Sequence, residues 1–245
     1  MDERVFYGPE QAGIHHEAFG RLAGRAADLL TAELAAAGLA SGTVVDLGCG
    51  SGILARRMIE AGYDVLGVDV SASMLEIARQ EAPGARFVGG SLLDAELPPA
   101  SVAVTATGEA LNYAVDARAG DAAFAALAAR VAAAVVPGGI LLFDVSVRGR
   151  SGPDRLRVQF HDRPGWSVGM RETEDDTSVT RAIATFRRLE DGRYERTDER
   201  HVLHLYDPAW LRSTLETAGF DAEVRAGYEP GESMAGWVVV LARRR

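Results

Sequence analysis

The sequence predicts an α/β fold in which helices cover a mostly parallel sheet and an antiparallel β segment is inserted late in the chain. Short apolar runs alternate with segments of helical periodicity as far as residue 145, a pattern typical of parallel βαβ units. A glycine-rich turn, Gly48–Gly52, joins the first such strand to a helix. Between residues 154 and 206 polar and apolar residues alternate between turn signals, which favours antiparallel strands.

Composition indicates one domain over residues 1–245 with small or neutral partners. With 245 residues, 47% of them hydrophobic, the chain can bury a full core. The net charge of −9 disfavours nucleic acid and anionic membranes as partners, and no apolar run is long enough to span a bilayer. The single Cys49 suits a reducing cytoplasm. All 26 basic residues are arginine, which excludes chemistry that needs a lysine amine.

The first 20 residues carry an unusual density of ring side chains before any confident helix. These are Phe6, Tyr7, His15, His16 and Phe19. They are predicted either to cap a site or to dock the terminus onto the core. Arg21–Ala37 follows as an alanine-rich amphipathic packing helix that ends at Gly38.

The apolar run Val44–Leu47 is interpreted as a buried strand, and the glycine turn after it as a ligand site. Glycines allow backbone torsions that a side chain forbids, and the helix that follows presents unpaired N–H groups at its start. Dinucleotide-binding turns use the order G-x-G-x-x-G, with glycine or alanine at the last position. This chain instead has G-x-G-x-G followed by Ile53, which disfavours a nicotinamide-dependent oxidoreductase.

A second buried strand, residues 64–69, ends in an acid. Asp69 lies 19 residues after Gly50, at the carboxyl end of this strand. An acidic side chain in that place can accept both hydrogen bonds of a ribose diol. The alternative role for Asp69 is to cap the helix predicted over Ser71–Glu81.

The remaining elements follow in order. Strands are predicted over Ala85–Val88, Val102–Thr107 and Ile140–Val145, with a helix over Gly120–Val136 and a turn at Pro137–Gly139. Turn signals at 163–165, 175–176 and 191–192 indicate about four strands in the inserted segment. Asp207 and Pro208 begin a helix that ends at Gly219, and residues 220–226 and 237–241 supply the last two strands.

The glycine turn preceded by Asp46, together with Asp69 and the later Pro137–Gly139, resembles the class I S-adenosylmethionine (SAM) methyltransferases over about residues 40–145. The resemblance implies a Rossmann-like, seven-stranded, mostly parallel sheet sandwiched by helices, with an antiparallel β insertion after the fifth strand. It also implies that the last two strands are antiparallel at the sheet edge and that SAM is the cofactor. Residues 40–145 are then the SAM-binding core, and residues 154–206 form a lid or a dimer contact.

The resemblance also implies a set of cofactor-binding residues. They are Tyr7, Phe19, Asp46, Gly48, Gly50, Asp69, Val70, Met74, Ser91, Leu92, Thr107 and Gly108. Val70 or Met74 would pack against the adenine ring, to which a soft apolar side chain is suited. Many relatives carry an acid at the position of Ser91, where it binds the adenine amino group. Either the Ser91 hydroxyl and the Leu92 backbone take over this role, or Asp94 reaches in, and the first arrangement is preferred.

Methyl transfer from a sulfonium requires in-line positioning of the acceptor and exclusion of water, and no covalent enzyme intermediate. An amine or hydroxyl acceptor would add the need for a general base, for which four side chains are available: His16, Glu109, Tyr113 and His201. Glu109, Asn112 and Tyr113 follow the fourth strand, beside the expected acceptor. His15, His161 and His204 are expected to make structural hydrogen bonds. The histidines lack metal-ligand spacing, so no metal site is expected.

The sequence therefore predicts a cytoplasmic SAM-dependent methyltransferase acting on an O or N atom of a small molecule. The acceptor pocket is expected to be lined by Tyr7, His16, Trp166, His201 and Tyr206. No nucleic acid or membrane partner is expected, and a homodimer is the alternative use of the insertion. The competing functions are a SAM-binding protein that acts on RNA or protein and, ranked lower, the oxidoreductase. The identity of the acceptor is left open.

Overall fold

The structure is a computed structural model that describes residues 6–152, 154–233 and 235–245. Its helices are α1 (Pro9–Phe19), α2 (Arg21–Ala36), α3 (Ile53–Glu60), α4 (Ala72–Glu81), α5 (Asp121–Ala134) and α6 (Pro208–Ala218), with a short 3-10 helix at Leu92–Asp94. The strands of the main sheet are β1 (Thr43–Leu47), β2 (Asp64–Asp69), β3 (Arg86–Gly89), β4 (Ser101–Ala106), β5 (Val135–Ser146), β10 (Phe220–Arg225) and β11 (Trp237–Arg244). The second sheet contains β6 (Leu156–Arg163), β7 (Trp166–Glu174), β8 (Ser178–Arg188) and β9 (Tyr194–His204).

The main sheet has seven strands in the order β10-β11-β5-β4-β1-β2-β3. Strands β1 to β5 pair in parallel, and β11 pairs antiparallel with both β5 and β10. The central strand β1 is buried on both faces, because Val44, Val45 and Leu47 are each at most 1% exposed. The predicted sheet, with its antiparallel pairings at one edge, is confirmed.

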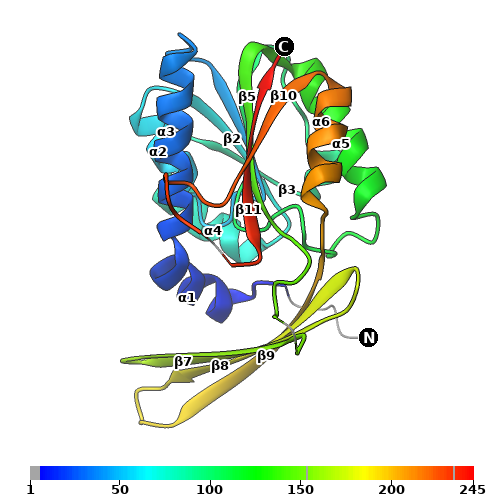
Figure 1. Cartoon of the computed structure of the whole chain (residues 1–245). Coiled ribbons are helices and arrows are strands. Elements are labelled where there is room, and N and C mark those ends of the chain that lie inside the picture. The colour runs from blue at the N-terminus through cyan, green and yellow to red at the C-terminus, as the bar shows by residue number, and fades with distance from the viewer. Residues whose placement is uncertain (1–5, 153, 234) are drawn as a thin grey trace.

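Helices cover both faces of this sheet and enclose two separate apolar cores (Figure 1). On one face, α5 and α6 bury residues such as Phe124 and Leu211 against the sheet. On the other face, α2 and α3 bury Leu30, Leu34 and Met58. The amphipathic pattern of these helices thus places the sheet in the middle layer.

The inserted segment forms its own antiparallel sheet in the order β6-β7-β8-β9. Its three hairpin turns lie where the turn signals predict them. The sheet lies across one end of the main sheet and next to α1 (Figure 1). Isolated bridges join Tyr113 to Leu203 and Val147 to Tyr206. Tyr113 follows β4 and Val147 follows β5, so the second sheet lies at the end where the parallel strands finish. The insertion therefore lies where ligands of open α/β sheets bind.

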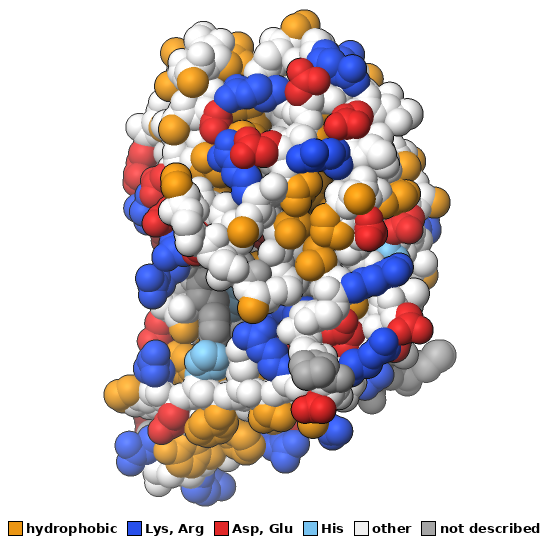
Figure 2. Space-filling view, in the orientation of Figure 1, with side chains coloured by type: hydrophobic (Ala, Val, Ile, Leu, Met, Phe, Trp, Pro, Cys, Tyr) orange, Lys and Arg blue, Asp and Glu red, His pale blue; other side chains and the backbone are white. Residues whose placement is uncertain are grey.

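The two faces of this second sheet differ in character. Leu156, Val158 and Phe160 alternate along β6 and are 45%, 68% and 66% exposed. Figure 2 shows hydrophobic side chains gathered on the outer face of the sheet. The intervening residues of β6 point the other way, toward the main domain, because successive side chains of a strand alternate between faces.

Two expectations at the level of elements are wrong. Residues 9–19 form a regular helix, which begins at Pro9 after Gly8, although no confident helix is predicted there. Strand β5 already begins at Val135, so Pro137–Gly139 lie within it rather than forming a turn before it. The pairing of β5 with β4 shifts register at this place, and Gly138 has a positive φ of 79°.

No helix in the described part of the chain is long and apolar enough to cross a bilayer.

Candidate active site

The glycine turn between β1 and α3 is built from torsions that favour glycine. Gly48, Gly50 and Gly52 have φ values of 69°, 51° and 79°. The N–H groups of Gly48 and Cys49 donate to the carbonyl of Val68 at 2.7 and 3.0 Å, which ties the turn to β2. The turn therefore brings main chain that carries no side chain at its three glycines to the carboxyl end of the sheet.

Asp69 fixes this turn from the end of β2. Its carboxylate accepts from the N–H of Gly50 at 2.9 Å and from the N–H of Ser71 at 2.8 Å, and the residue is 9% exposed. Burial raises the pKa of Asp69, and these backbone donors partly offset the effect. Ser71 itself caps α4 by accepting from the N–H of Met74. Each Asp69 oxygen keeps acceptor capacity for a ribose hydroxyl.

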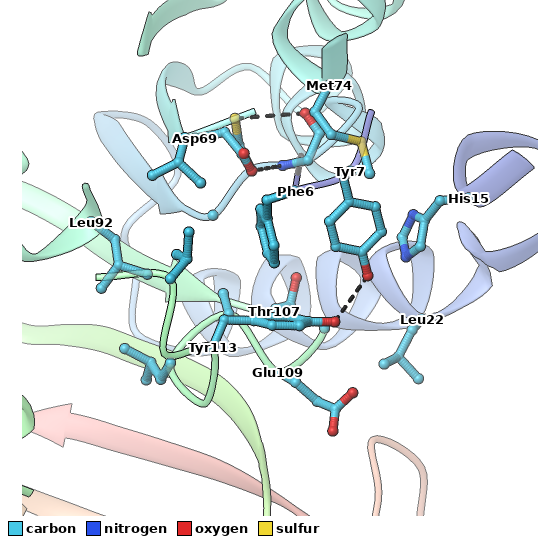
Figure 3. A pocket seen from close by; sticks show the side chains of 18 of the residues that line it. Phe6, Tyr7, His15, Leu22, Asp69, Met74, Leu92, Thr107, Glu109 and Tyr113 are labelled. Atoms are coloured by element: carbon cyan, nitrogen blue, oxygen red, sulfur yellow. Dashed lines mark hydrogen bonds between the residues drawn. The ribbon is translucent and has the colours of Figure 1, made fainter. Parts of the chain in front are cut away.

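A cavity of about 620 Å³ opens beside the turn and Asp69 (Figure 3). The predicted cofactor residues that line it are Tyr7, Gly48, Gly50, Asp69, Val70, Met74, Ser91, Leu92, Thr107 and Gly108. Asp46 is not among its lining residues. It is 1% exposed beneath the turn, accepts from Thr105 Oγ1 at 2.7 Å, and burial raises its pKa to about 7. The Phe19 side chain lies outside the described residues.

The lining of the cavity fits an adenosyl group attached to an amino acid. Val70, Met74 and Leu92 offer apolar surface for a flat ring, Asp69 offers acceptors for a diol, and the glycine turn offers open main chain. Arg21 and Leu22, from the start of α2, line the same cavity. The volume lies within the range of small-molecule sites.

The loop after β4 is held by buried groups on both sides. Asp144 on β5 accepts from the N–H groups of Gly108 and Glu109 at 2.7 and 2.8 Å. Asn112, which is fully buried, bonds to the main chain of Ser146 and to the carbonyl of His204. These bonds hold the loop in place and occupy the Asn112 amide, which is therefore not available to a ligand.

Glu109 lines the cavity, but it belongs to a buried ion network. Its carboxylate pairs with Arg150 at 2.7 Å and with Arg181 at 3.0 Å, and it accepts from the Ser146 hydroxyl. Both arginines also pair with Glu172, which is 0% exposed. Burial alone would raise the pKa of Glu109, but Arg181 and Arg150 hold it below its ordinary value. Glu109 is therefore an ionised anchor and not a base poised near neutral pH.

Tyr7 and Tyr113 present two bonded hydroxyls to the cavity. The two oxygens are 2.9 Å apart, and Arg181 Nη1 donates to Tyr113 Oη at 3.1 Å (Figure 3). Burial raises the pKa of both phenols, so they remain protonated. They can bind an acceptor by hydrogen bonds.

The histidines are arranged differently from the prediction. His16 bonds to Ser51 Oγ at 2.9 Å, and His201 bonds to Glu199 at 2.8 Å behind the ring of Tyr7; neither lines the cavity. His15 and His161, which were expected to be structural, do line it. Burial, with Arg181 nearby, lowers the pKa of His15 to about 4. Its imidazole is therefore neutral at pH 7.

Of the predicted acceptor-pocket residues, Tyr7 and Tyr206 line the cavity. Trp166 instead packs with Ile14, Val168 and Ile183 between α1 and the second sheet. The second sheet contributes other residues to the lining: Gln159, His161, Val168, Met170, Arg181 and Ile183. Within the described residues, no group of three or more His, Cys, Asp and Glu could hold a metal ion.

Comparison with known proteins agrees with this geometry. Residues 44–139 match a family model described as a methyltransferase domain. A putative methyltransferase from Geobacillus sp. (strain WCH70) is 28% identical over 184 residues, which cover 72% of this chain and 73% of that protein.

Two solved structures are similar over nearly the whole chain. A SAM-dependent methyltransferase from Clostridium acetobutylicum ATCC 824 has a TM-score of 0.81 at 18% identity, covering 95% of this chain and 97% of that one. A SAM-bound amino pentose methyltransferase from Micromonospora echinaspora has a TM-score of 0.75 at 21% identity and covers all of both chains.

The sheet order, the glycine turn and Asp69 together define an α/β protein that binds a nucleotide-type cofactor. With the methyltransferase domain matched over residues 44–139, these features support a class I SAM-dependent methyltransferase. It is an enzyme whose cofactor is SAM, as the sequence predicts.

Proposed function

We propose that this methyltransferase acts on a small molecule, at an O or N atom, inside a chamber shared by the cofactor site, α1 and the second sheet. The observation that carries the proposal is the lining of the cavity. Residues of the glycine turn and inward-facing residues of β6, β7 and β8 border one continuous space of about 620 Å³. Such a chamber suits a metabolite, whereas a folded RNA or protein could not enter it.

The residues of this chain position the acceptor, provide polar groups to bind it and exclude water from the chamber. SAM provides an already activated methyl group. The Tyr7 and Tyr113 hydroxyls orient the acceptor, and Glu109 with its two arginines keeps the loop after β4 rigid. Val168, Met170 and Ile183 exclude water from the acceptor side.

We assign to His15 the orientation of the acceptor rather than removal of its proton, because a pKa of about 4 makes its imidazole a weak base near pH 7. Its ring lies edge-on to Tyr7, with centroids 5.2 Å apart, and lines the cavity in its neutral form. Neither His16 nor His201 borders the cavity, and Glu109 is committed to two arginines. His15 thus takes the place beside the acceptor that the sequence analysis gave to His16 and His201.

The acceptor class that suits this chamber is a hydroxylated or aminated ring. Aromatic and apolar walls alternate with His15, His161 and Gln159, which can bond to ring substituents. The structural similarity to an amino pentose methyltransferase is consistent with this class. Amino sugars are therefore the first methyl acceptors to test.

The decisive experiment is transfer of labelled methyl from SAM into separate pools of amino sugars, other hydroxylated metabolites, RNA and protein. We expect label in a small-molecule pool and none in the polymers, with the Asp69→Ala variant as the negative control. Label appearing in RNA or protein alone would overturn the proposal.

We further propose that two copies meet in the cytoplasm through the outer face of the second sheet, where Val158 and Phe160 are exposed (Figure 2). Phe160→Asp should then shift the sedimentation of the protein from dimer to monomer, while Val88→Asp, at an exposed position on β3 of the main sheet, is the comparison. A monomeric unmodified protein would contradict this assignment.

A further inference from the structure

The loop that follows β3 contributes no acidic side chain to the lining of the cavity. Ser91 follows β3 and lines the cavity next to Leu92. Asp94, the acid considered as a replacement, is not among the lining residues. Its side chain is 64% exposed and pairs with Arg118 at 2.6 Å. Recognition of the adenine amino group must therefore come from another arrangement.

The hydroxyl of Ser91 has a fixed direction. Ser91 Oγ donates to Asp116 Oδ2 at 2.6 Å and accepts from the N–H of Leu93 at 3.2 Å. A hydroxyl has one hydrogen and two acceptor lone pairs. Since an ionised carboxylate can only accept, the hydrogen of Ser91 is committed to Asp116. One lone pair of the Ser91 oxygen remains, and it can only accept a hydrogen bond.

Asp116 is itself held firmly. The Arg118 N–H and Nε donate to Oδ1 at 2.9 and 3.0 Å, and Arg118 Nη2 donates to Oδ2 at 2.5 Å. With the Ser91 bond, the acceptor positions of this carboxylate are filled. The Arg118 guanidinium, together with Ser91, keeps the pKa of Asp116 well below its ordinary value. Asp116 also lines the cavity, but since its acceptor positions are filled, it stays ionised and acts on the ligand through Ser91.

We propose that Asp116 is a positioning residue that makes Ser91 an obligate hydrogen-bond acceptor for the 6-amino group of the cofactor's adenine. A purine with a carbonyl at that position would place its oxygen, an acceptor, against the Ser91 oxygen, which can also only accept, so no hydrogen bond could form. The Ser91–Asp116 pair thus selects an aminopurine over an oxopurine without an acid touching the base. The inference concerns the cofactor alone and does not depend on the proposed acceptor.

The test measures ligand selectivity by calorimetry with two stable probes, S-adenosylhomocysteine and S-inosylhomocysteine, which carries the oxopurine. We expect the unmodified protein to prefer the adenosyl probe by about tenfold, the effect of one hydrogen bond. Asp116→Ala frees the Ser91 hydrogen to turn toward the ligand, so the preference should fall to about threefold or less. Asp94→Ala, which removes the other carboxylate on Arg118, should keep the full preference.

A second variant makes the result independent of a general loss of binding. In Asp116→Asn the amide oxygen must face the Arg118 N–H and Nε, so the amide NH₂ faces Ser91 and donates to it. The Ser91 hydrogen is then available to the ligand, and selectivity should shift toward the inosyl probe. If both Asp116 variants retain the original ratio of affinities, Asp116 does not set the direction of Ser91 and the proposal is overturned.

Discussion

Two carboxylates at the site, Asp69 and Glu109, are both buried but differ in the groups that bond to them. Asp69 is bonded only by backbone N–H groups, so it keeps capacity for ligand hydroxyls. Glu109 is held between Arg150 and Arg181 and has little left to offer. The sequence shows an acid after a strand in both cases. The partners that separate their roles come from distant segments, which sequence spacing does not reveal.

Asp69→Ala should weaken binding of SAM and S-adenosylhomocysteine by about 2–3 kcal/mol, because charge-assisted hydrogen bonds to the ribose are lost and the Gly50 N–H loses its acceptor. Calorimetry measures the change. Asp64→Ala, at the exposed start of the same strand, serves as the matched control. An unchanged affinity in the Asp69 variant would remove Asp69 from the cofactor site.

His15→Gln should lower kcat/KM by about tenfold with little effect on cofactor binding, as expected on loss of one hydrogen bond that orients the acceptor. His16→Gln, one residue later and outside the cavity lining, should be far milder. The pKa of His15 is lowered to about 4, so protonation should disturb this contact with the acceptor only as pH falls through that value. A kcat/KM profile with its acid limb near the ordinary histidine value of about 6.5 would argue for another group.

At the scale of elements, the strands and turns with strong local signals were predictable. The three hairpin turns of the second sheet and the α6 helix, with its Asp207 cap and its end at Gly219, lie as predicted. Helix α1 was not predictable in this way, because its apolar residues form no clear stripe along one face of the helix. Had that helix been recognised, Gln11 and His15 would have shared one face, and both line the cavity.

The lining contributed by β6 was missed for a related reason. Gln159 and His161 face the cavity while Val158 and Phe160 face outward, so the polar residues of this strand point inward. A period of two identifies the two faces of a strand but not which face meets the main domain. That choice depends on packing against α1 and the loop after β4.

The second sheet is attached to the main domain by a buried ion network, which gives a prediction for Glu172. Glu172→Gln should lower the free energy of unfolding by about 3–5 kcal/mol, because Arg150 and Arg181 lose a buried counter-charge. Glu195→Gln, exposed on β9, should have almost no effect. Denaturant unfolding measures both. A small loss for Glu172, comparable to that of Glu195, would show that the network does not hold the sheet in place.

At the scale of the whole molecule, the two halves of the site have different origins. The cofactor half is built from the strand ends and turns of residues 44–108, whose motifs are local and readable. The proposed acceptor half arises where α1, the loop after β4 and the second sheet meet, and no local sequence motif indicates that these three segments are neighbours. The fold and the cofactor could therefore be predicted, whereas the acceptor-facing residues could be predicted only in part.

This division can be tested by replacing residues 157–201 with a flexible linker. Leu156 and Val202 lie in one row of the four-stranded sheet, through Thr173 and Thr180, so their separation is about 14 Å across three strand spacings. A linker of roughly eight glycine and serine residues spans that distance. Leu203 and Tyr206 are kept, because they pack against the main domain.

The replacement removes Glu172 and Arg181 together, so Glu109 remains paired with Arg150 and no buried charge is left alone. Binding of S-adenosylhomocysteine should weaken by less than about tenfold, since the glycine turn and Asp69 keep their bonds, while the segment before α2 loses the Glu199 bonds to the Tyr7 and Gly8 N–H groups and the Thr185 bond to Gln11. Methyl transfer should fall by at least about 100-fold, because the acceptor loses its walls and its alignment with the methyl group. Transfer at the rate of the unmodified protein would show that the acceptor binds elsewhere and that the second sheet serves only as a contact between subunits.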